Sequence, residues 1–295
     1  MIVNEHRVNQ LLDEARYYED HAMWLHAVQV FQRLIDAFPE RLEFRARLGN
    51  VYLEMGNLAA AELVLLQALR NDAQNPDILY SLGIACYQSG DFERALFYMQ
   101  QLAGRKLPKV HYSLGLIFWQ QGELAHAERH FRLALEYQPD NIDTALALGE
   151  TLLRAGKAED AVTVLATAAA RAPRDGGLQH TLGVARVAAE QWDEAVLAFR
   201  TAIGLDPANE EARIAVAGAY MKLRRFDDAE AGLKEVLRNN TSSVRAMLAL
   251  GKLALLKSNR KRAEEYFRQV LTIDPDNEDA LEQLRYFTPH DTSAS

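Results

Sequence analysis

The feature that most constrains this chain is an alanine that returns at a nearly fixed interval. Six of the seven intervals between the eight alanines are 34 residues long, and one, from Ala95 to Ala127, is 32. The eight residues are Ala27, Ala61, Ala95, Ala127, Ala161, Ala195, Ala229 and Ala263. A period of this length predicts a stack of similar units, each touching only its neighbours. Such a stack offers an extended surface for binding, and its repeat pattern alone does not name the partner.

Other residue types recur in register with the alanines. With the alanine placed at repeat position 20, the expected repeats are residues 8–41, 42–75, 76–107, 108–141, 142–175, 176–209, 210–243 and 244–277. Position 8 is small throughout: Ala15, Gly49, Gly83, Gly115, Gly149, Gly183, Ala217 and Gly251. Position 24 is large and apolar: Phe31, Leu65, Met99, Phe131, Leu165, Phe199, Leu233 and Phe267. Position 32 is proline in five repeats: Pro39, Pro139, Pro173, Pro207 and Pro275.

These columns predict a helical hairpin in each repeat. Positions 4, 7, 8 and 11 form one apolar stripe at helical spacing, and positions 20, 24, 27 and 28 form a second. Glycine at position 15, in Gly56, Gly90, Gly122 and Gly156, can take the left-handed conformation that ends the first helix. Proline at position 32 stops the second helix because it lacks a backbone donor. Small residues at positions 8 and 20 let the two helices approach, so enlarging Gly149 or Ala161 should cost typically about 1–3 kcal/mol.

The small-residue, aromatic and proline columns resemble the tetratricopeptide repeat over residues 8–277. The resemblance implies an all-α, right-handed superhelical solenoid of eight antiparallel helix hairpins, whose first helices line a concave groove. It also implies peptide binding or complex assembly, and no catalysis by the repeats. The third repeat is two residues short, and the first has Glu14 and Ala15 where Leu-Gly is usual. Residues 1–7 form an N-terminal segment, residues 278–287 are expected to be a capping helix, and residues 288–295 a disordered tail.

Charge and composition narrow the class of protein. The net charge of −8 argues against general affinity for nucleic acid, which favours cationic surfaces. No apolar run is long enough to span a bilayer, and the first residues lack the apolar core of a secretory signal. The lone Cys86 falls in an apolar stripe and is expected to pack as a small apolar residue. We therefore expect a cytoplasmic protein without membrane insertion.

One candidate binding surface is aromatic. Positions 5, 9 and 12 share one face of the first helix, which the family resemblance places in the groove. In the third and fourth repeats this face carries Tyr80, Ile84, Tyr87, Tyr112, Leu116 and Trp119. Tyrosine and tryptophan bury a large area while keeping a polar group, as peptide-binding hot spots do. The alternative, which the sequence leaves open, is that these side chains pack between neighbouring first helices.

A second candidate surface is basic. Residues 210–277 hold 13 lysines and arginines against 10 carboxylates, and Lys222, Arg245 and Lys252 are expected on the groove side. They could receive an acidic peptide, or they could simply be solvated. A further basic run, residues 257–262, is expected to be a solubilising rim at the turn of the last repeat.

Other candidate sites are weak. Co-chaperones of the resembled family bind a terminal carboxylate with five polar or basic residues, of which only Asn50 and Lys109 have counterparts here. His126 and His130 have a spacing that could share a metal, but no third ligand is evident and surface histidines are the better interpretation. No nucleophile with its base, phosphate-binding loop or metal motif is found. No cofactor, metal site or catalytic residue is therefore predicted.

The sequence favours a non-catalytic scaffold or adaptor that binds an extended peptide or a partner helix of another protein in its concave groove. One alternative is self-assembly into a homo-oligomer, for which Ile2, Val3, Glu14 and Ala15 are candidate contact residues. Another is a non-catalytic targeting subunit of a larger enzyme complex. An RNA-reading helical repeat is disfavoured because the groove is largely apolar and the chain is acidic.

Overall fold

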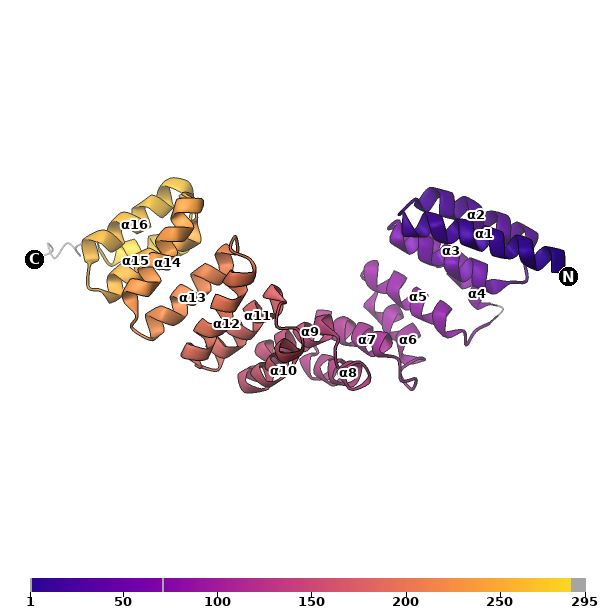
Figure 1. Cartoon of the computed structure of the whole chain (residues 1–295), viewed down its shortest axis with the longest axis horizontal. Coiled ribbons are helices and arrows are strands. Elements are labelled where there is room, and N and C mark those ends of the chain that lie inside the picture. Colours follow the sequence, from indigo (N-terminus) through magenta and orange to yellow (C-terminus); the bar gives the residue numbers. More distant parts are fainter. Residues whose placement is uncertain (1, 71, 288–295) are drawn as a thin grey trace, which may run out of the picture. The chain divides into compact units, whose positions relative to one another are not determined.

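The chain is entirely helical wherever its structure is described. The computed structural model describes residues 2–70 and 72–287, and this part contains seventeen α-helices and no strand (Figure 1). The all-α prediction is confirmed. The predicted tail, residues 288–295, lies outside the described residues.

The helices fall into two compact units, Met1–Thr144 and Ala145–Ser295. The helices of the first unit, in chain order, are α1 (Ile2–Asp20), α2 (Trp24–Ala37), α3 (Leu42–Glu54), α4 (Leu58–Leu69), α5 (Pro76–Gln88), α6 (Phe92–Gln100), α7 (Pro108–Gln120) and α8 (Leu124–Tyr137). Each odd-numbered helix packs against the even-numbered helix that follows it, and α2, α4 and α6 each also pack against the next odd-numbered helix. The unit is a stack of helix hairpins.

The second unit continues the same pattern. Its helices are α9 (Ile142–Arg154), which begins three residues before the unit boundary, α10 (Ala158–Arg171), α11 (Gly176–Ala188), α12 (Trp192–Leu205), α13 (Glu210–Lys222), α14 (Phe226–Asn239), α15 (Val244–Leu256), α16 (Arg260–Ile273) and α17 (Glu278–Arg285). The last helix packs against α16 and buries Ala280 completely. It is where the sequence places a capping helix.

In six of the eight hairpins, one large buried side chain lies over the glycine at position 8; Ala15 and Ala217 hold this position in the other two. All eight position-20 alanines and all eight position-24 side chains are fully buried. A methyl group added to Gly183 would lie 2.6 Å from two carbons of the Phe199 ring, and one added to Gly115 would lie 2.5 Å from the Phe131 ring. Gly49, Gly83, Gly149 and Gly251 meet their own position-24 side chains in the same way. The small residue at position 8 of the first helix therefore makes room for the position-24 side chain of the second helix. The two helices of the hairpin pack together at this contact.

The turn between the two helices requires a left-handed residue in every repeat. Gly56, Gly90, Gly122 and Gly156 have φ angles of 70°, 80°, 78° and 72°, as their position predicted. The other four repeats reach the same conformation without glycine. Those four residues are Ala22, Glu190, Arg224 and Ser258, with φ angles from 53° to 59°. A residue with a Cβ is strained there, so the backbone geometry of the hairpin overrides the local preference of the residue.

Local sequence also determines where helices begin and end. Several helices are capped by a side chain that accepts a hydrogen bond from a backbone N–H of the first turn. The caps of second helices include Asn57, Asp91 and Asn259, and those of first helices include Asp175 and Asn209. Each of the five position-32 prolines lies two residues beyond the end of its second helix, as expected. Two ends differ from the expected repeat. Helix α1 starts at Ile2, inside the segment that precedes the first repeat, and α6 in the short third repeat has only nine residues.

Substituting Gly183 by alanine should destabilise the second unit by about 1–3 kcal/mol, because the new methyl group overlaps the rigid Phe199 ring. Gly218→Ala, in the adjacent helix α13, is the matched control, since a methyl group there meets no atom within 4 Å. That substitution should instead stabilise by about 0.5–1 kcal/mol. Urea denaturation of the two variants measures both effects, and equal shifts for the two would contradict the packing described here.

Replacing Glu190 by glycine should stabilise the chain by up to about 1 kcal/mol, because it relieves a left-handed residue that bears a Cβ. The reverse change at the equivalent turn, Gly156→Ala, should destabilise by a similar amount, although the added methyl group has open space. Thermal unfolding of both variants tests the prediction. A cost at Glu190→Gly would show that the glutamate side chain matters more than its backbone conformation.

Candidate functional site

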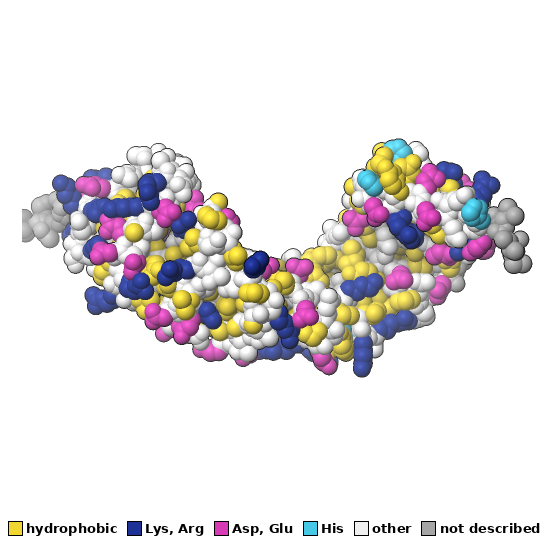
Figure 2. All heavy atoms as spheres, viewed as in Figure 1, with side chains coloured by type: hydrophobic (Ala, Val, Ile, Leu, Met, Phe, Trp, Pro, Cys, Tyr) yellow, Lys and Arg dark blue, Asp and Glu magenta, His cyan; other side chains and the backbone are white. Residues whose placement is uncertain are grey.

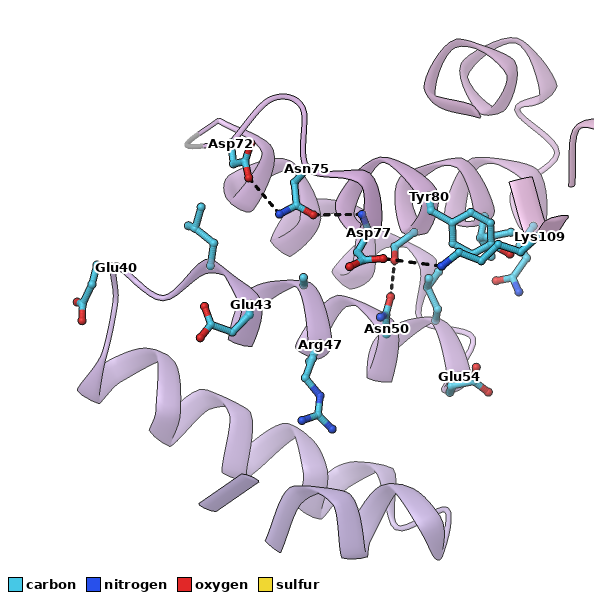
Figure 3. A pocket seen from close by; sticks show the side chains of 16 residues that line it. Glu40, Glu43, Arg47, Asn50, Glu54, Asp72, Asn75, Asp77, Tyr80 and Lys109 are labelled. Carbon is cyan, nitrogen blue, oxygen red and sulfur yellow. Dashed lines mark hydrogen bonds and ion pairs between the residues drawn. The ribbon is translucent and has the colours of Figure 1, made fainter. Parts of the chain in front are cut away.

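The first unit has a pocket of about 900 Å³ over the exposed faces of α3 and α5 (Figure 3). It is lined by side chains of α3, α5, the loops that precede them and the start of α7: Glu40, Leu42, Glu43, Ala46, Arg47, Asn50, Leu53, Glu54, Asp72, Asn75, Asp77, Tyr80, Ser81, Ile84, Gln88 and Lys109. Most of these occupy positions 2, 5, 6, 9, 12 or 13 of their repeats. The pocket thus lies on the helix face that the sequence assigns to a groove.

The pocket is acidic. Five of its lining side chains are carboxylates and two are cationic. Both cations are paired within the chain: Arg47 contacts the carboxylate of Glu19, and the Lys109 ammonium lies 3.7 Å from Asp77. The same ammonium is 4.3 Å from the centre of the Tyr80 ring, a cation–π contact. The electrostatic potential inside the pocket is therefore dominated by its carboxylates.

Hydrogen bonds fix the polar floor of the pocket. The buried Ser81 hydroxyl donates to Oδ1 of Asn50 at 2.5 Å and so joins α5 to α3. Since that oxygen is occupied, the Asn50 amide nitrogen remains as a donor on an exposed side chain that lines the pocket. At the N-terminal end of α5, Asn75 caps the helix by accepting from the backbone of Asp77, and its amide donates to Asp72. These contacts hold the pocket's polar groups in defined positions.

The residues of the predicted aromatic surface have different surroundings. Tyr80 and Ile84 line the pocket. The ring of Tyr87 lies 5.9 Å from that of Phe92, and the ring of Tyr112 lies 5.8 Å from the buried Phe131. All six side chains, including those of Leu116 and Trp119, are half-buried. The contact of Tyr112 is with the second helix of its own repeat, which neither alternative anticipated, whereas Tyr80 lines the pocket.

The three predicted basic groove residues are exposed but already engaged within the second unit. Arg245 pairs with Glu211 at 2.6 Å, and Lys252 pairs with Asp279 on α17 at 3.0 Å. The ammonium of Lys222 lies 5.5 Å from the Trp192 ring. An acidic peptide would have to compete with these internal contacts, which weakens the case for a basic docking surface here.

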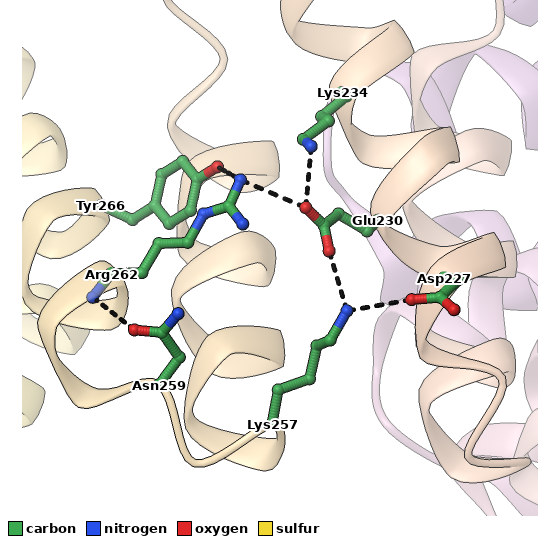
Figure 4. Close-up of polar contacts among 7 residues, drawn as sticks. All are labelled: Asp227, Glu230, Lys234, Lys257, Asn259, Arg262 and Tyr266. Carbon is green, nitrogen blue, oxygen red and sulfur yellow. Dashed lines mark hydrogen bonds and ion pairs between the residues drawn. The ribbon is translucent and has the colours of Figure 1, made fainter.

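The basic run at residues 257–262 is likewise tied to acidic neighbours (Figure 4). Lys257 lies 3.0 Å from both Asp227 and Glu230, and Arg262 lies 3.2 Å from Glu230. Hydrogen bonds from Lys234 and Lys257 to the carboxylate lower the pKa of Glu230 to about 2. The run joins α15 and α16 to α14, so its charges help to hold adjacent hairpins together.

The histidines of the fourth repeat are not alike, and the expectation of two surface histidines is wrong for one of them. His126 is exposed and pairs with Glu123 at 3.0 Å. His130 instead faces the buried His111, with 3.1 Å between their Nδ1 atoms, and stacks on Phe118. Burial, followed by the nearby charges of His111, Arg129 and His126, lowers the pKa of His130 to about 4. The pair is a structural contact between α7 and α8.

Three further residues singled out in the sequence are buried or paired. Cys86 is buried, and burial raises the pKa of its thiol, so it packs as an apolar residue. Ala15, a candidate contact for self-assembly, is fully buried, and Glu14 lies 3.6 Å from Arg33. The side chains of Ile2 and Val3 lie outside the described residues.

Within the described part of the chain, no three histidine, cysteine or acidic side chains are arranged to hold a metal ion. None of the described helices combines the length and apolar character needed to cross a lipid bilayer. On the face drawn in Figure 2, basic and acidic side chains are interspersed and do not form one basic patch.

Comparison with known sequences decides the family. Profiles described as tetratricopeptide repeat match residues 12–76, 46–110 and 80–142, then 118–183 and 186–253, and finally 244–277. Together they cover nearly all of the eight expected repeats. The chain belongs to the tetratricopeptide repeat family. No enzyme family is indicated by these matches.

Individual tetratricopeptide repeat proteins are similar only at low identity. Tetratricopeptide repeat protein 8 of Caenorhabditis elegans is 25% identical over 158 residues, which are 52% of this chain and 31% of that protein. Superkiller complex protein 3 of Mus musculus is 24% identical over 300 residues, covering 83% of this chain and 19% of that protein. The chain therefore spans less than a third of the length of either relative.

A solved structure shows the same fold. The C-terminal part of a tetratricopeptide repeat-containing protein from Cytophaga hutchinsonii aligns with a TM-score of 0.67 at 16% identity. The alignment covers 81% of this chain and 99% of that structure. At this identity the likeness is one of fold, and it supports the assignment of a helical solenoid.

The family pattern pointed to the helix face on which the pocket lies, but it did not predict the acidic residues of the pocket. Five carboxylates were not singled out because they are scattered over 38 residues and three repeats: Glu40, Glu43, Glu54, Asp72 and Asp77. A count of charges at positions 2 and 13 of adjacent repeats would have found Glu43, Glu54 and Asp77. The loop residues Glu40 and Asp72 have no such signal, since their place depends on how the hairpins stack.

Stability of the first unit should fall as the pH drops from about 6.5 toward 4, because His130 gains a proton more readily when the chain unfolds. Its folded pKa is lowered, so the stability present at neutral pH is lost as pH falls through this window. His130→Gln should show a smaller decrease in the urea midpoint between about pH 7.5 and about pH 5 than the wild type. The exposed His21→Gln serves as control, and an undiminished pH dependence in His130→Gln would contradict the prediction.

Proposed function

We propose that this protein is a non-catalytic interaction module that holds an extended segment of a partner protein in the pocket over α3 and α5. The observation that carries the proposal is the pocket itself. It is about 900 Å³ in volume, lies on the unpaired face of two adjacent first helices, and combines half-buried Tyr80 and Ile84 with fixed polar groups. Apolar anchors beside positioned hydrogen-bond donors are what a peptide site needs.

The shape of the pocket favours an extended segment. It follows α3 from Glu43 to Glu54, eleven residues apart, which corresponds to about 16 Å along the helix axis. An extended chain of roughly five residues covers this length. The amide of Asn50, oriented by Ser81, lies between these ends and can donate to a backbone carbonyl of such a segment.

The family and a relative support a role in protein assemblies. The name Superkiller complex protein 3 places that relative in a complex, although this chain spans only 19% of its length. The family matches indicate no enzyme class, and a metal cluster is not found among the described side chains. We infer a scaffold or adaptor role, in which binding energy comes from burying a few anchor residues of the partner. The cytoplasmic location remains a prediction from the sequence.

Substituting Tyr80 by alanine should weaken a bound peptide by about tenfold, because it removes the largest aromatic surface in the pocket. The experiment selects binders to the intact chain from a random peptide library and measures the affinity of enriched peptides for the variant. Tyr286→Ala, which removes an exposed tyrosine at the end of the second unit, is the matched control and should bind normally.

Circular dichroism of both tyrosine variants establishes that the helices are intact. If the library yields no peptide whose binding depends on Tyr80, the pocket is not a peptide site and the proposed function fails.

A further inference from the structure

Resting on the proposed function, we propose that the segment bound in the α3–α5 pocket is basic, with two lysine or arginine residues about five positions apart. The pocket lies on unpartnered helix faces, and its charges select the occupant. Its five carboxylates outnumber two cations that are both already paired inside the chain. A partner of opposite charge is thus favoured over a neutral or acidic one.

Carboxylates lie at both ends of the pocket. Glu40, Glu43, Asp72 and Asp77 surround the end where α3 and α5 begin, and Glu54 lies at the other end of α3 (Figure 3). Three of the five already have an internal partner. Glu43 accepts a hydrogen bond from Arg41, Asp72 accepts one from Asn75, and Asp77 forms an ion pair with Lys109 at 3.7 Å. Glu40 and Glu54 are exposed and make no ion pair or hydrogen bond with any described residue.

The two unpaired carboxylates therefore give the proposal its spacing. Glu54 lies about 16 Å from Glu43 along the axis of α3. Glu40 lies at the same end of the pocket as Glu43. Extended chain advances about 3.3 Å per residue, so cations roughly five positions apart reach both ends. Between them, Tyr80 and Ile84 contact the apolar parts of the segment, and the Asn50 amide donates to its backbone.

The same features disfavour the ligand known for the clamp motif that the sequence only partly matches. A terminal carboxylate would enter a site in which Lys109 is bound to Asp77 and Tyr80, and in which five carboxylates repel it. Removing a carboxylate from water and placing it beside like charges costs more free energy than the attraction of one already paired lysine supplies. The charge preference of the pocket is thus reversed relative to that motif.

Three labelled peptides of equal length, with a common glycine, serine and tyrosine background, test the proposal. One carries two arginines five positions apart, the second carries glutamates there, and the third carries glutamines. Fluorescence anisotropy with the full chain should show the arginine peptide binding at least about tenfold more tightly than the glutamate peptide. Raising NaCl from about 20 mM to about 300 mM should weaken that binding, because exposed charges are screened.

Charge-matched variants locate the binding. Glu40→Gln combined with Glu54→Gln should weaken the arginine peptide about three- to tenfold and leave the glutamine peptide unchanged. Glu136→Gln combined with Glu282→Gln removes the same charge from two exposed glutamates outside the pocket and should have no effect beyond a small change in salt dependence. Because none of the four glutamates has an ion-pair or hydrogen-bond partner among the described residues, the fold should be retained in both variants.

Each other outcome overturns the proposal in a distinct way. If the glutamine peptide binds as tightly as the arginine peptide and both depend on Tyr80, the charge inference fails while the peptide site stands. Tighter binding of the glutamate peptide, or no binding of any of the three, also overturns the inference; the library selection then decides separately whether a peptide site exists. Light scattering that shows a dimer lost in Glu40→Gln/Glu54→Gln would identify a second copy of this chain as the occupant.

Discussion

The contact on which the structure depends is the one between a position-24 side chain and the small residue at position 8 of the same repeat. At Gly115 and Gly183 the space that a methyl group would take is filled by a phenylalanine ring. This contact brings the two helices of a hairpin together and buries the side chain completely. Since each hairpin is closed in this way and then packs on the next, the chain needs no single large core.

Closing every hairpin by the same contact imposes the same turn on all eight repeats. Four repeats meet this demand with glycine, while Ala22, Glu190, Arg224 and Ser258 accept a positive φ. The strain at these four residues is small beside the burial that the hairpin gains. The same turn conformation thus recurs because the packing of each hairpin requires it. In the four repeats without glycine, another residue adopts that conformation.

A regular backbone leaves the exposed face of the first helices free to vary, and the two units differ there. In the first unit, α3 and α5 present carboxylates around a pocket whose cations are internally paired. In the second unit, Arg245 and Lys252 are paired with Glu211 and Asp279, so exposed cations are largely balanced. The chemistry of binding is therefore a property of surface residues laid over a common scaffold, and the family name alone does not provide it.

The sequence by itself determined the repeat, the two helices of each hairpin, the glycine turns and the proline ends. It could do so because these features depend on residues close together in the chain and recur in several repeats. It also gave the helix face on which Tyr80 and Ile84 lie. Only the tertiary structure decided which residues share the pocket, that Tyr112 packs on Phe131, and that His130 faces His111. The physical reason is that ion pairs, ring contacts and pockets depend on how packed helices are spaced and rotated against one another, and no local sequence pattern encodes that geometry.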